Sequence, residues 1–239
     1  MTAIEGFPDH RYATDDGLLA LGGDLTSERL LLAYRKGIFP WYNPGEPILW
    51  WSPNPRCVLF PDNFQASRSL QKAIRKQQFS FTFDNCFCDV IEKCAGPRPG
   101  GPGTWITQDM KNAYTKLHDL GYAHSVETWK DGELVGGLYG ISLGKIFFGE
   151  SMFSTVSDAS KAAMNYLVHC LLRWDYKLID CQITSSHLIS LGAQEIPRDQ
   201  FISIIESATT TKSLTGSWAC RQPDNSNKHS DSGIIKNQT

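Results

Sequence analysis

Several features that define other protein classes are absent from this sequence. No run approaches the roughly 18 apolar residues of a membrane-spanning helix, and the N-terminus MTAIEGFPDHRYATDDG lacks the charged-then-apolar pattern of a signal peptide. The seven cysteines are odd in number and scattered along the chain. We therefore expect a protein without a membrane partner, with reduced thiols, that works in the cytoplasm.

Motifs for bound nucleotides and metals are missing as well. The chain has no GxxxxGK[ST] loop for ATP, no GxGxxG after a strand for a dinucleotide, and no CxxC pair. Cys86, Cys88 and Cys94 are close in sequence, but their spacing does not suit zinc, and buried helix cysteines are the favoured interpretation. We expect neither a cofactor nor a metal.

The most unusual segment present is GIFPWYNPGEPILWWSPNPR, residues 37–56, called here the aromatic segment. It contains Trp41, Trp50 and Trp51 together with five prolines. Because proline fixes φ and removes a backbone donor, we expect a stiff loop and neither a helix nor a central strand. Two interpretations remain: the rings stack on a base or another flat ligand, or they form a local core that anchors the loop.

Hydrophobic periodicity predicts helices and strands in a mixed α+β (α/β) arrangement. Helices are expected over 24–37, 67–77, 84–94, from the cap at Thr107 to Gly121, 158–173, 186–191 and 198–207. Strands are expected over 57–60, 79–83, 124–129, 133–139, 145–153 and 177–183. The helix at 158–173 joins two strands in a crossover, so those strands should lie parallel.

Composition divides the chain into three parts. Residues 1–62 are loop-rich and aromatic, and we expect a small N-terminal domain there. Residues 63–207 carry the α/β pattern and should form a second, larger domain. From 208 to 239 the chain is rich in Thr, Ser and Asn with few apolar anchors, which predicts a disordered tail.

Two acidic residues occur in strands that are otherwise apolar. Asp180 and Gln182, in LIDCQI, should share one face, because residues i and i+2 of a strand point the same way. Glu150, in FFGESMFS, needs a partner if it is buried. At adjacent strand ends the two carboxylates would form an anionic pocket suited to an amine, a lysine or an arginine. The structural alternatives are that Asp180 caps the next helix and that Glu150 pairs with Lys161.

A basic stripe is predicted on the helix at 67–77. Arg68, Lys72, Arg75 and Lys76 fall on one helical face, and residues 63–83 contain no acid. On a protein of net charge −2, such a stripe suits a phosphate backbone. A plain solvated face is the equally open alternative.

A family resemblance is carried by GIFPW…ILWWSP in the aromatic segment, GESMFS (149–154), LIDCQ (178–182), ELVGGLYG (133–140) and HLISLGA (187–193). In this combination the sequence resembles the leucyl/phenylalanyl-tRNA–protein transferase family, over roughly residues 7 to 205. The resemblance implies an aminoacyltransferase that moves leucine or phenylalanine, and less well methionine, from tRNA to the α-amine of proteins beginning with Arg or Lys. This marks the acceptors for N-end rule degradation. It also implies a C-terminal domain similar to the acetyltransferase (GNAT) fold, and we expect a monomer.

The same resemblance assigns roles to residues of this chain. It implies that Tyr34 and Trp41 meet the 3′ adenosine of the tRNA, that Glu150, Asp180 and Gln182 form the reaction centre, and that the basic stripe grips tRNA. The hydrophobic pocket for the Leu or Phe side chain would be lined by Leu138, Met152, Met164, Leu167, Ile179 and Ile183. One departure is Ser185, at a position where the family often has Asn.

A mechanistic hypothesis follows from these roles. An aminoacyl ester is already activated, so the enzyme must align two reactants and deprotonate an amine. We expect Gln182, held by Asp180, to contact the attacking amine, and Asp180 to help remove its proton. A deep slot would exclude the stiff, β-branched Val and Ile and would admit some Met, because one methylene discriminates weakly.

Two rival interpretations remain. An acetyl-CoA-dependent N-acetyltransferase would use a [QR]xxGx[GA] phosphate loop, which residues 98–103 match in letters, although prolines stand where a helix should start. A non-catalytic tRNA-binding module would explain the aromatic segment and the basic stripe. It would not explain two buried acids beside Gln182.

Overall fold

The computed structural model describes residues 6–76, 78–96 and 104–221. Its helices are α1 (Ser27–Arg35), α2 (Arg68–Arg75), α3 (Phe87–Cys94), α4 (Gln108–Asp119), α5 (Ala159–Arg173), α6 (Ser186–Ser190) and α7 (Arg198–Thr209). Its strands are β1 (Leu18–Leu21), β2 (Phe39–Pro40), β3 (Leu49–Trp51), β4 (Arg56–Leu59), β5 (Ser80–Phe83), β6 (Ala123–Lys130), β7 (Glu133–Leu143), β8 (Ile146–Ser154), β9 (Leu178–Gln182) and β10 (Gln194–Ile196). All the helices and strands expected from periodicity are present, and the mixed α/β class is confirmed.

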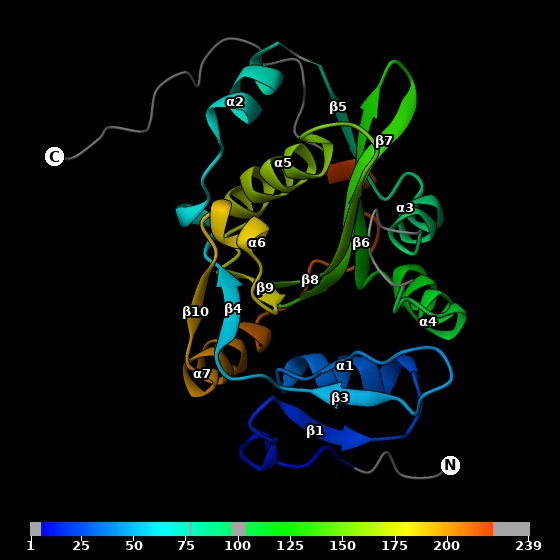
Figure 1. Ribbon diagram of the computed structural model, residues 1–239, viewed down its shortest axis with the longest axis vertical. Helices are drawn as coiled ribbons and strands as arrows, with labels where there is room; N and C mark the ends of the chain where they lie inside the picture. Colours follow the sequence, from blue (N-terminus) through cyan, green and yellow to red (C-terminus); the bar gives the residue numbers. More distant parts are fainter. Residues whose placement is uncertain (1–5, 77, 97–103, 222–239) are drawn as a thin grey trace, which may run out of the picture.

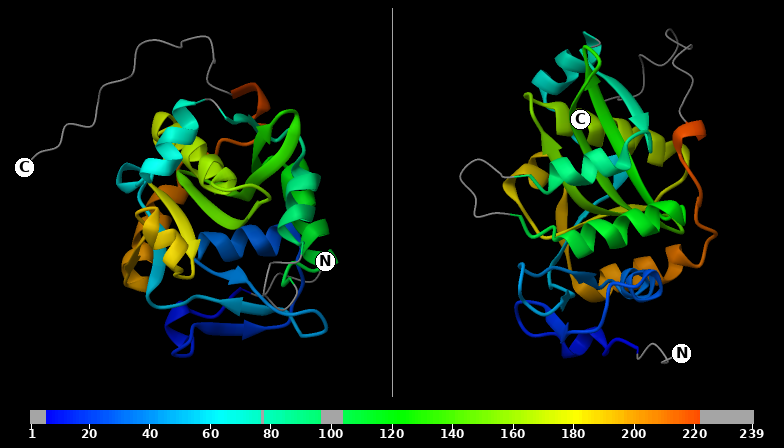
Figure 2. Two further views of the ribbon diagram at one scale, coloured as in Figure 1. Left: turned by 45° about the horizontal axis from the view of Figure 1, so that its top comes forward. Right: turned by 90° about the vertical axis from the view of Figure 1, so that its right-hand side faces the viewer.

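The strands form two sheets. A three-stranded sheet has the order β1-β3-β2, and a seven-stranded sheet has the order β10-β4-β9-β8-β7-β6-β5. Figure 1 shows the small sheet at one end of the molecule, with α1 lying between it and the large sheet. Helices α3 and α4 cover one face of the large sheet and α5 covers the other, as the turned views of Figure 2 also show. No helix in these described ranges has the length and apolarity needed to cross a bilayer.

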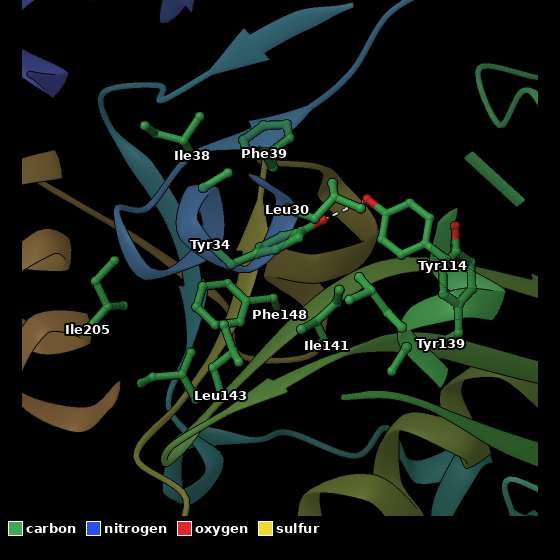
Figure 3. Close-up of a cluster of buried hydrophobic side chains, with 14 of the residues drawn as sticks. Leu30, Tyr34, Ile38, Phe39, Tyr114, Tyr139, Ile141, Leu143, Phe148 and Ile205 are labelled. Atoms are coloured by element: carbon green, nitrogen blue, oxygen red, sulfur yellow. Dashed lines mark hydrogen bonds between the residues drawn. The ribbon is translucent and has the colours of Figure 1, made fainter. Parts of the chain in front are cut away.

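Helix α1 packs between the two sheets, and its sequence is amphipathic and well capped. The Thr26 hydroxyl accepts a hydrogen bond from a backbone amide of the first turn. One face of the helix is buried: Leu30 and Tyr34 are fully covered, and the centre of the Tyr34 ring lies 5.2 Å from that of Phe148 on β8. Gly37 then ends the helix with φ +71, where a Cβ would meet side chains of α7. Figure 3 shows this packing of α1 on the large sheet.

The aromatic segment differs from the prediction of a pure loop. Strand β3 is the central strand of the small sheet and pairs with both β1 and β2. It can do so because its three residues lie in the proline-free stretch between Pro47 and Pro53. Trp50 is buried and its indole N–H donates to the Gly22 carbonyl at 2.8 Å, so the anchoring interpretation holds for this ring.

The large sheet brings the predicted acidic strands together. Strands β8 and β9 are parallel neighbours joined through α5, which confirms the crossover. Strand β4 pairs antiparallel with β9 on one side and with β10 on the other. Strand β4 lies within residues 1–62, which composition assigns to the N-terminal domain, yet its hydrogen bonds place it in the large sheet. The three-residue strand β10 was not predicted, because QEI carries no alternating pattern.

The predicted disordered tail begins at residue 208, but the structure describes the chain to Arg221. Trp218 is fully buried and stacks on His124 at 3.8 Å, while its backbone N–H donates to Asp84 at 2.6 Å. Trp218 therefore anchors the first part of this polar segment, together with Ser213, which accepts a hydrogen bond from the Gly144 N–H, and Leu214, which packs against the core. Residues 222–239 and the Gly–Pro loop 97–103 lie outside the described residues.

Candidate functional site

A cavity of about 480 Å³ opens where the small sheet, β8, β9 and α6 meet. Many of its lining residues are apolar, and Glu150 and Gln182 contribute polar groups. The remaining lining residues are Phe39, Pro40, Trp41, Trp105, Leu138, Tyr139, Phe147, Gly149, Ser151, Met152, Met164, Ile179, Cys181, Ile183, Thr184, Ser185, His187 and Leu188. Such a cavity suits a ligand with a large apolar part and a polar reacting end.

The structure brings together most of the predicted site residues. Trp41, Leu138, Glu150, Met152, Met164, Ile179, Gln182 and Ile183 all line this one cavity. Tyr34, Leu167 and Asp180 do not: each is fully buried outside its lining. Tyr34 therefore has no surface free to stack on adenosine in this conformation.

Glu150 is the centre of a buried hydrogen-bond network. Its Oε1 accepts from the Tyr34 hydroxyl at 2.7 Å and from the Gln182 side-chain amide at 2.9 Å, and its Oε2 accepts from the Tyr114 hydroxyl at 2.9 Å. The two tyrosine oxygens lie 2.6 Å apart (Figure 3). Sequence reasoning did not single out Tyr114.

This environment changes the acidity of the network. Burial raises the pKa of Glu150 from 4.5 to about 7, against hydrogen bonds from Tyr34 and Tyr114 that lower it. Burial, followed by the charge of Glu150, raises the pKa of both tyrosines well above the usual range. The tyrosines therefore remain O–H donors, while Glu150 exchanges its proton near neutral pH.

Gln182 reaches Glu150 because strand β9 ends irregularly. The pairing of β4 with β9 shifts register between Cys57 and Val58, and Gln182 itself has φ +63. Its side chain consequently points to Glu150 and its backbone N–H donates to Asp180 Oδ1 at 3.0 Å. The expectation that Asp180 and Gln182 share one face is wrong, since simple alternation does not survive the bulge and the left-handed residue.

Asp180 is paired with an arginine that sequence reasoning did not single out. Arg56 Nε and Nη2 donate to the two Asp180 carboxylate oxygens at 2.8 and 2.7 Å, and both side chains are fully buried. The guanidinium also lies 4.8 Å from the Phe39 ring centre and 4.5 Å from that of Phe201. The sequence signal that could have identified Arg56 is its position as the charged residue of the otherwise apolar strand RCVL.

This pairing corrects the picture of a pocket with two free carboxylates. Asp180 is neutralised by Arg56 outside the cavity lining, and only Glu150 faces the cavity. The alternatives also fail, because Ser185 caps α6 and Lys161 pairs with Asp158 at 3.2 Å.

Apolar side chains surround the cavity on its solvent side. Trp41 is 40% exposed and Ile183 is 44% exposed, although both line the cavity. The Trp41 ring lies 5.8 Å from that of Trp51, whose indole N–H donates to the Trp41 carbonyl at 2.6 Å. Trp51 thus fixes the position of Trp41, and part of the Trp41 ring remains exposed to solvent.

The basic stripe lies on α2, apart from the cavity lining. Arg68, Lys72, Arg75 and Lys76 are all exposed. Among the described residues, no carboxylate lies within 4.0 Å of their cationic groups, so their charge is available to a partner or to solvent. In the same ranges no group of three or more His, Cys, Asp or Glu side chains is placed to hold a metal.

Comparison with known proteins identifies the family. Residues 58–206 match the family model for leucyl/phenylalanyl-tRNA protein transferase, and residues 23–54 match that of its N-terminal domain. A leucyl/phenylalanyl-tRNA–protein transferase from Cellvibrio japonicus is 61% identical over 82% of this chain and 84% of its own length. Proteins of the same name from Syntrophus aciditrophicus (89% of this chain, 90% of theirs) and Methylococcus capsulatus (88% and 90%) are 56% and 53% identical.

Similarity to solved structures is much weaker. The structure of L-PGS from Bacillus licheniformis matches with a TM-score of 0.38 and 12% identity, covering 66% of this chain and 51% of that one, too low to bear on the fold. The sequence matches are decisive by themselves, and they confirm the resemblance seen in the motifs. This chain belongs to the leucyl/phenylalanyl-tRNA–protein transferase family.

Proposed function

We propose that this protein transfers leucine or phenylalanine, and less well methionine, from aminoacyl-tRNA to the α-amine of proteins that begin with Arg or Lys. The observation that carries the proposal is the shared cavity, in which an apolar wall meets the Glu150–Gln182 pair beside the exposed ring of Trp41. A tRNA-linked apolar side chain and an incoming amine can occupy one such space. The product would then enter N-end rule degradation.

The apolar wall is suited to the side chain of the transferred residue. Leu138, Met164 and Ile179 are almost completely buried in the molecule yet reach the cavity, together with Met152 and Ile183. Methionine side chains adapt to ligands of different shape, which favours acceptance of Leu, Phe and Met. We propose that Leu167 supports this wall from the core and does not touch the substrate.

Glu150 is our candidate for the group that receives the proton of the attacking amine. Its pKa of about 7 lies close to that of an α-ammonium group, usually 7.7–8.0, so proton transfer between them is nearly balanced. The network tolerates both protonation states, because one tyrosine hydroxyl can donate to the other, 2.6 Å away, when Glu150 holds a proton. Gln182 would orient the amine, since its amide already contacts Glu150.

The remaining predicted residues have supporting or binding roles in this proposal. Asp180, paired with Arg56, fixes Gln182 through its backbone N–H, and Tyr34 orients Glu150. Trp41 stacks on the 3′ adenosine of the tRNA, for which its exposed ring is suited. The negative charge of Glu150 would also favour acceptors with a basic first side chain.

The fold type, the oligomeric state and the cellular location complete the proposal. We propose a GNAT-like architecture for the large sheet, which the parallel β8–α5–β9 unit supports. We also propose that the protein works as a monomer. The cytoplasm is where aminoacyl-tRNA is available.

One assay tests the proposed function. Purified protein is mixed with Phe-tRNA and a peptide that begins with Lys, and phenylalanine should appear on the peptide α-amine by mass spectrometry. Acetyl-CoA in place of Phe-tRNA should give no product. Acetylated peptide would favour an N-acetyltransferase, and tRNA binding without product would favour a binding module. Val-tRNA should be a poor donor, and equal use of Val and Phe would contradict the slot.

The basic stripe on α2 should contribute charge, and not shape, to tRNA binding. Replacing Lys72 and Arg75 together with alanine should weaken tRNA binding and reduce the slope of log K against log salt concentration by roughly 2. The measurement is a filter-binding or anisotropy titration at several salt concentrations. An unchanged slope would assign these residues to a solvated face.

Two variants serve as matched controls for that titration. Trp41→Ala should weaken binding by about 1–3 kcal/mol per lost base stack while the salt slope stays the same. Lys116→Ala removes an exposed lysine on α4, which covers the face of the large sheet away from α5, and it should change neither quantity. Full tRNA affinity in Trp41→Ala would rule out its stacking role.

A further inference from the structure

A pair of thiols lies beside Gln182, one of them in the cavity wall and the other behind it. Cys181 lines the cavity and is partly exposed, while Cys57 is fully buried in the same apolar cluster. The register shift between β4 and β9 creates this arrangement. Cys57 pairs with Gln182 and Val58 with Asp180, so Cys181 is the extra residue of the bulge. The two cysteines are therefore neighbours across the β4–β9 pairing, where a disulfide could join the two strands.

The chemistry of the two sulfurs is asymmetric. A hydrogen bond from the Cys181 thiol, helped by one from Thr184, lowers the pKa of Cys57 against the effect of burial. The same thiol–thiol contact and burial raise the pKa of Cys181 well above its usual value. Cys181 borders the cavity and is the thiol that a small peroxide meets first, while Cys57 lies behind it and acts as the resolving thiol. Both are free thiols in the structure.

We propose that Cys57 and Cys181 are a redox modification site, which a small peroxide converts to a disulfide that stops aminoacyl transfer. Cys181 loses its proton to solvent, and its sulfur attacks one oxygen of hydrogen peroxide, breaking the O–O bond and giving a sulfenic acid and hydroxide. The Cys57 sulfur then attacks the sulfenic sulfur of Cys181, forming the S–S bond and expelling the sulfenic oxygen as water. Overall, two thiols lose two electrons and two protons, and one peroxide becomes two waters.

The consequence for activity rests on the proposed function of the cavity. A covalent S–S bond is about 2.05 Å long, shorter than any contact between free thiols, so Cys181 must move toward β4 when it forms. Gln182 is the next residue, with φ +63, and its amide holds Glu150. Displacing a positioned group by about 1 Å can cost on the order of 100-fold in rate. We expect at least a tenfold loss of transfer.

The experiment treats the full chain with hydrogen peroxide, then maps peptides and assays transfer in parallel. The expected result is a linked Cys57–Cys181 peptide lighter by two hydrogens, a loss of Phe transfer, and recovery of both with dithiothreitol. Cys57→Ala should keep its activity after peroxide, because its basal transfer does not depend on this thiol. Cys170→Ala is the matched control: it removes a buried thiol from the same cluster and should remain sensitive.

The outcomes separate this proposal from the proposed function. Reduced protein that transfers phenylalanine but yields no linked peptide overturns the thiol pair, as does a linked protein with full activity. Cys57→Ala that loses activity as wild type does would place the oxidation elsewhere. Reduced protein that transfers nothing contradicts the proposed function instead, while the peptide map still reports whether the thiols pair.

Discussion

Replacing Glu150 with glutamine should lower the rate of aminoacyl transfer by on the order of 10²- to 10⁴-fold, because the variant lacks the carboxylate that we propose as the proton acceptor. Glutamine keeps the shape of the side chain and retains partners for Tyr34 and Tyr114, so the cavity should stay intact. Single-turnover transfer of phenylalanine, measured against pH, gives the test. In wild type the rate should rise through about pH 7 as Glu150 ionises.

The pH profile distinguishes the enzyme group from the substrate. Ionisation of the acceptor α-amine, normally at pH 7.7–8.0, gives its own rising limb, and only this limb should remain in the Glu150→Gln variant. A variant that keeps wild-type rates at every pH would remove Glu150 from the mechanism.

A second carboxyl provides the matched control for Glu150. Glu127 on β6 is also fully buried, its pKa is also raised by burial, and its oxygens accept from Ser125 and Thr82 at 2.5 Å. It lies outside the cavity lining. Glu127→Gln should therefore keep transfer close to wild type, although both substitutions remove a buried ionisable group.

The pH dependence of the unfolding free energy provides an independent measurement of the Glu150 pKa. Because burial raises this pKa above its value in the unfolded chain, ionising Glu150 costs free energy in the folded state. The stabilisation of the protonated form is complete below about pH 4.5 and is lost as pH rises through about 7. The unfolding free energy of wild type minus that of Glu150→Gln should fall over this range and then level off.

Asp180→Ala should have a large effect on both stability and turnover. Its removal leaves the Arg56 guanidinium fully buried without its bidentate partner, which typically costs about 3–5 kcal/mol. In a chain of 239 residues this corresponds to a fall in melting temperature of roughly 10 °C. Transfer should fall about 100-fold or more because Gln182 loses its backbone anchor, while tRNA binding stays nearly intact.

Two further variants separate positioning from folding. Arg56→Met combined with Asp180→Leu replaces the ion pair with apolar side chains and should recover much of the lost stability without restoring transfer. Asp175→Ala removes an exposed partner of Lys177 and should leave the melting temperature nearly unchanged. An Asp180→Ala protein with wild-type melting and turnover would disprove any role for this carboxylate.

The fold was predictable where a local pattern dominates. Helix α5 and its flanking strands follow from apolar spacing, and the parallel pairing of β8 with β9 follows from chain topology alone. Strand β3 was missed because prolines on both sides of it made the whole segment look like a loop. Strand β10 was missed because three residues are too few to show an alternating apolar pattern. Trp218 was assigned to a disordered tail, since composition averages over the few residues that anchor this segment.

The sequence predicted which residues form the candidate site better than it predicted where their side chains point. Glu150 stood out as an acid in an apolar strand, and the structure gives it hydrogen-bond partners from three elements. The direction of Gln182 depended on a bulge that involves two strands far apart in sequence, which no local pattern reveals. The search for acidic residues in apolar strands identified Glu150 and Asp180. The same search for basic residues would have identified Arg56.

The position of β4 has a consequence for how the protein is made. Arg56 and Asp180 are separated by 124 residues, and at 5–20 residues per second a ribosome needs roughly 6–25 s to synthesise the chain between them. Until β9 emerges, the nascent chain carries an apolar strand with both edges unpaired and an arginine without its counter-charge. The large sheet therefore forms late in translation, around one of the earliest segments of the chain.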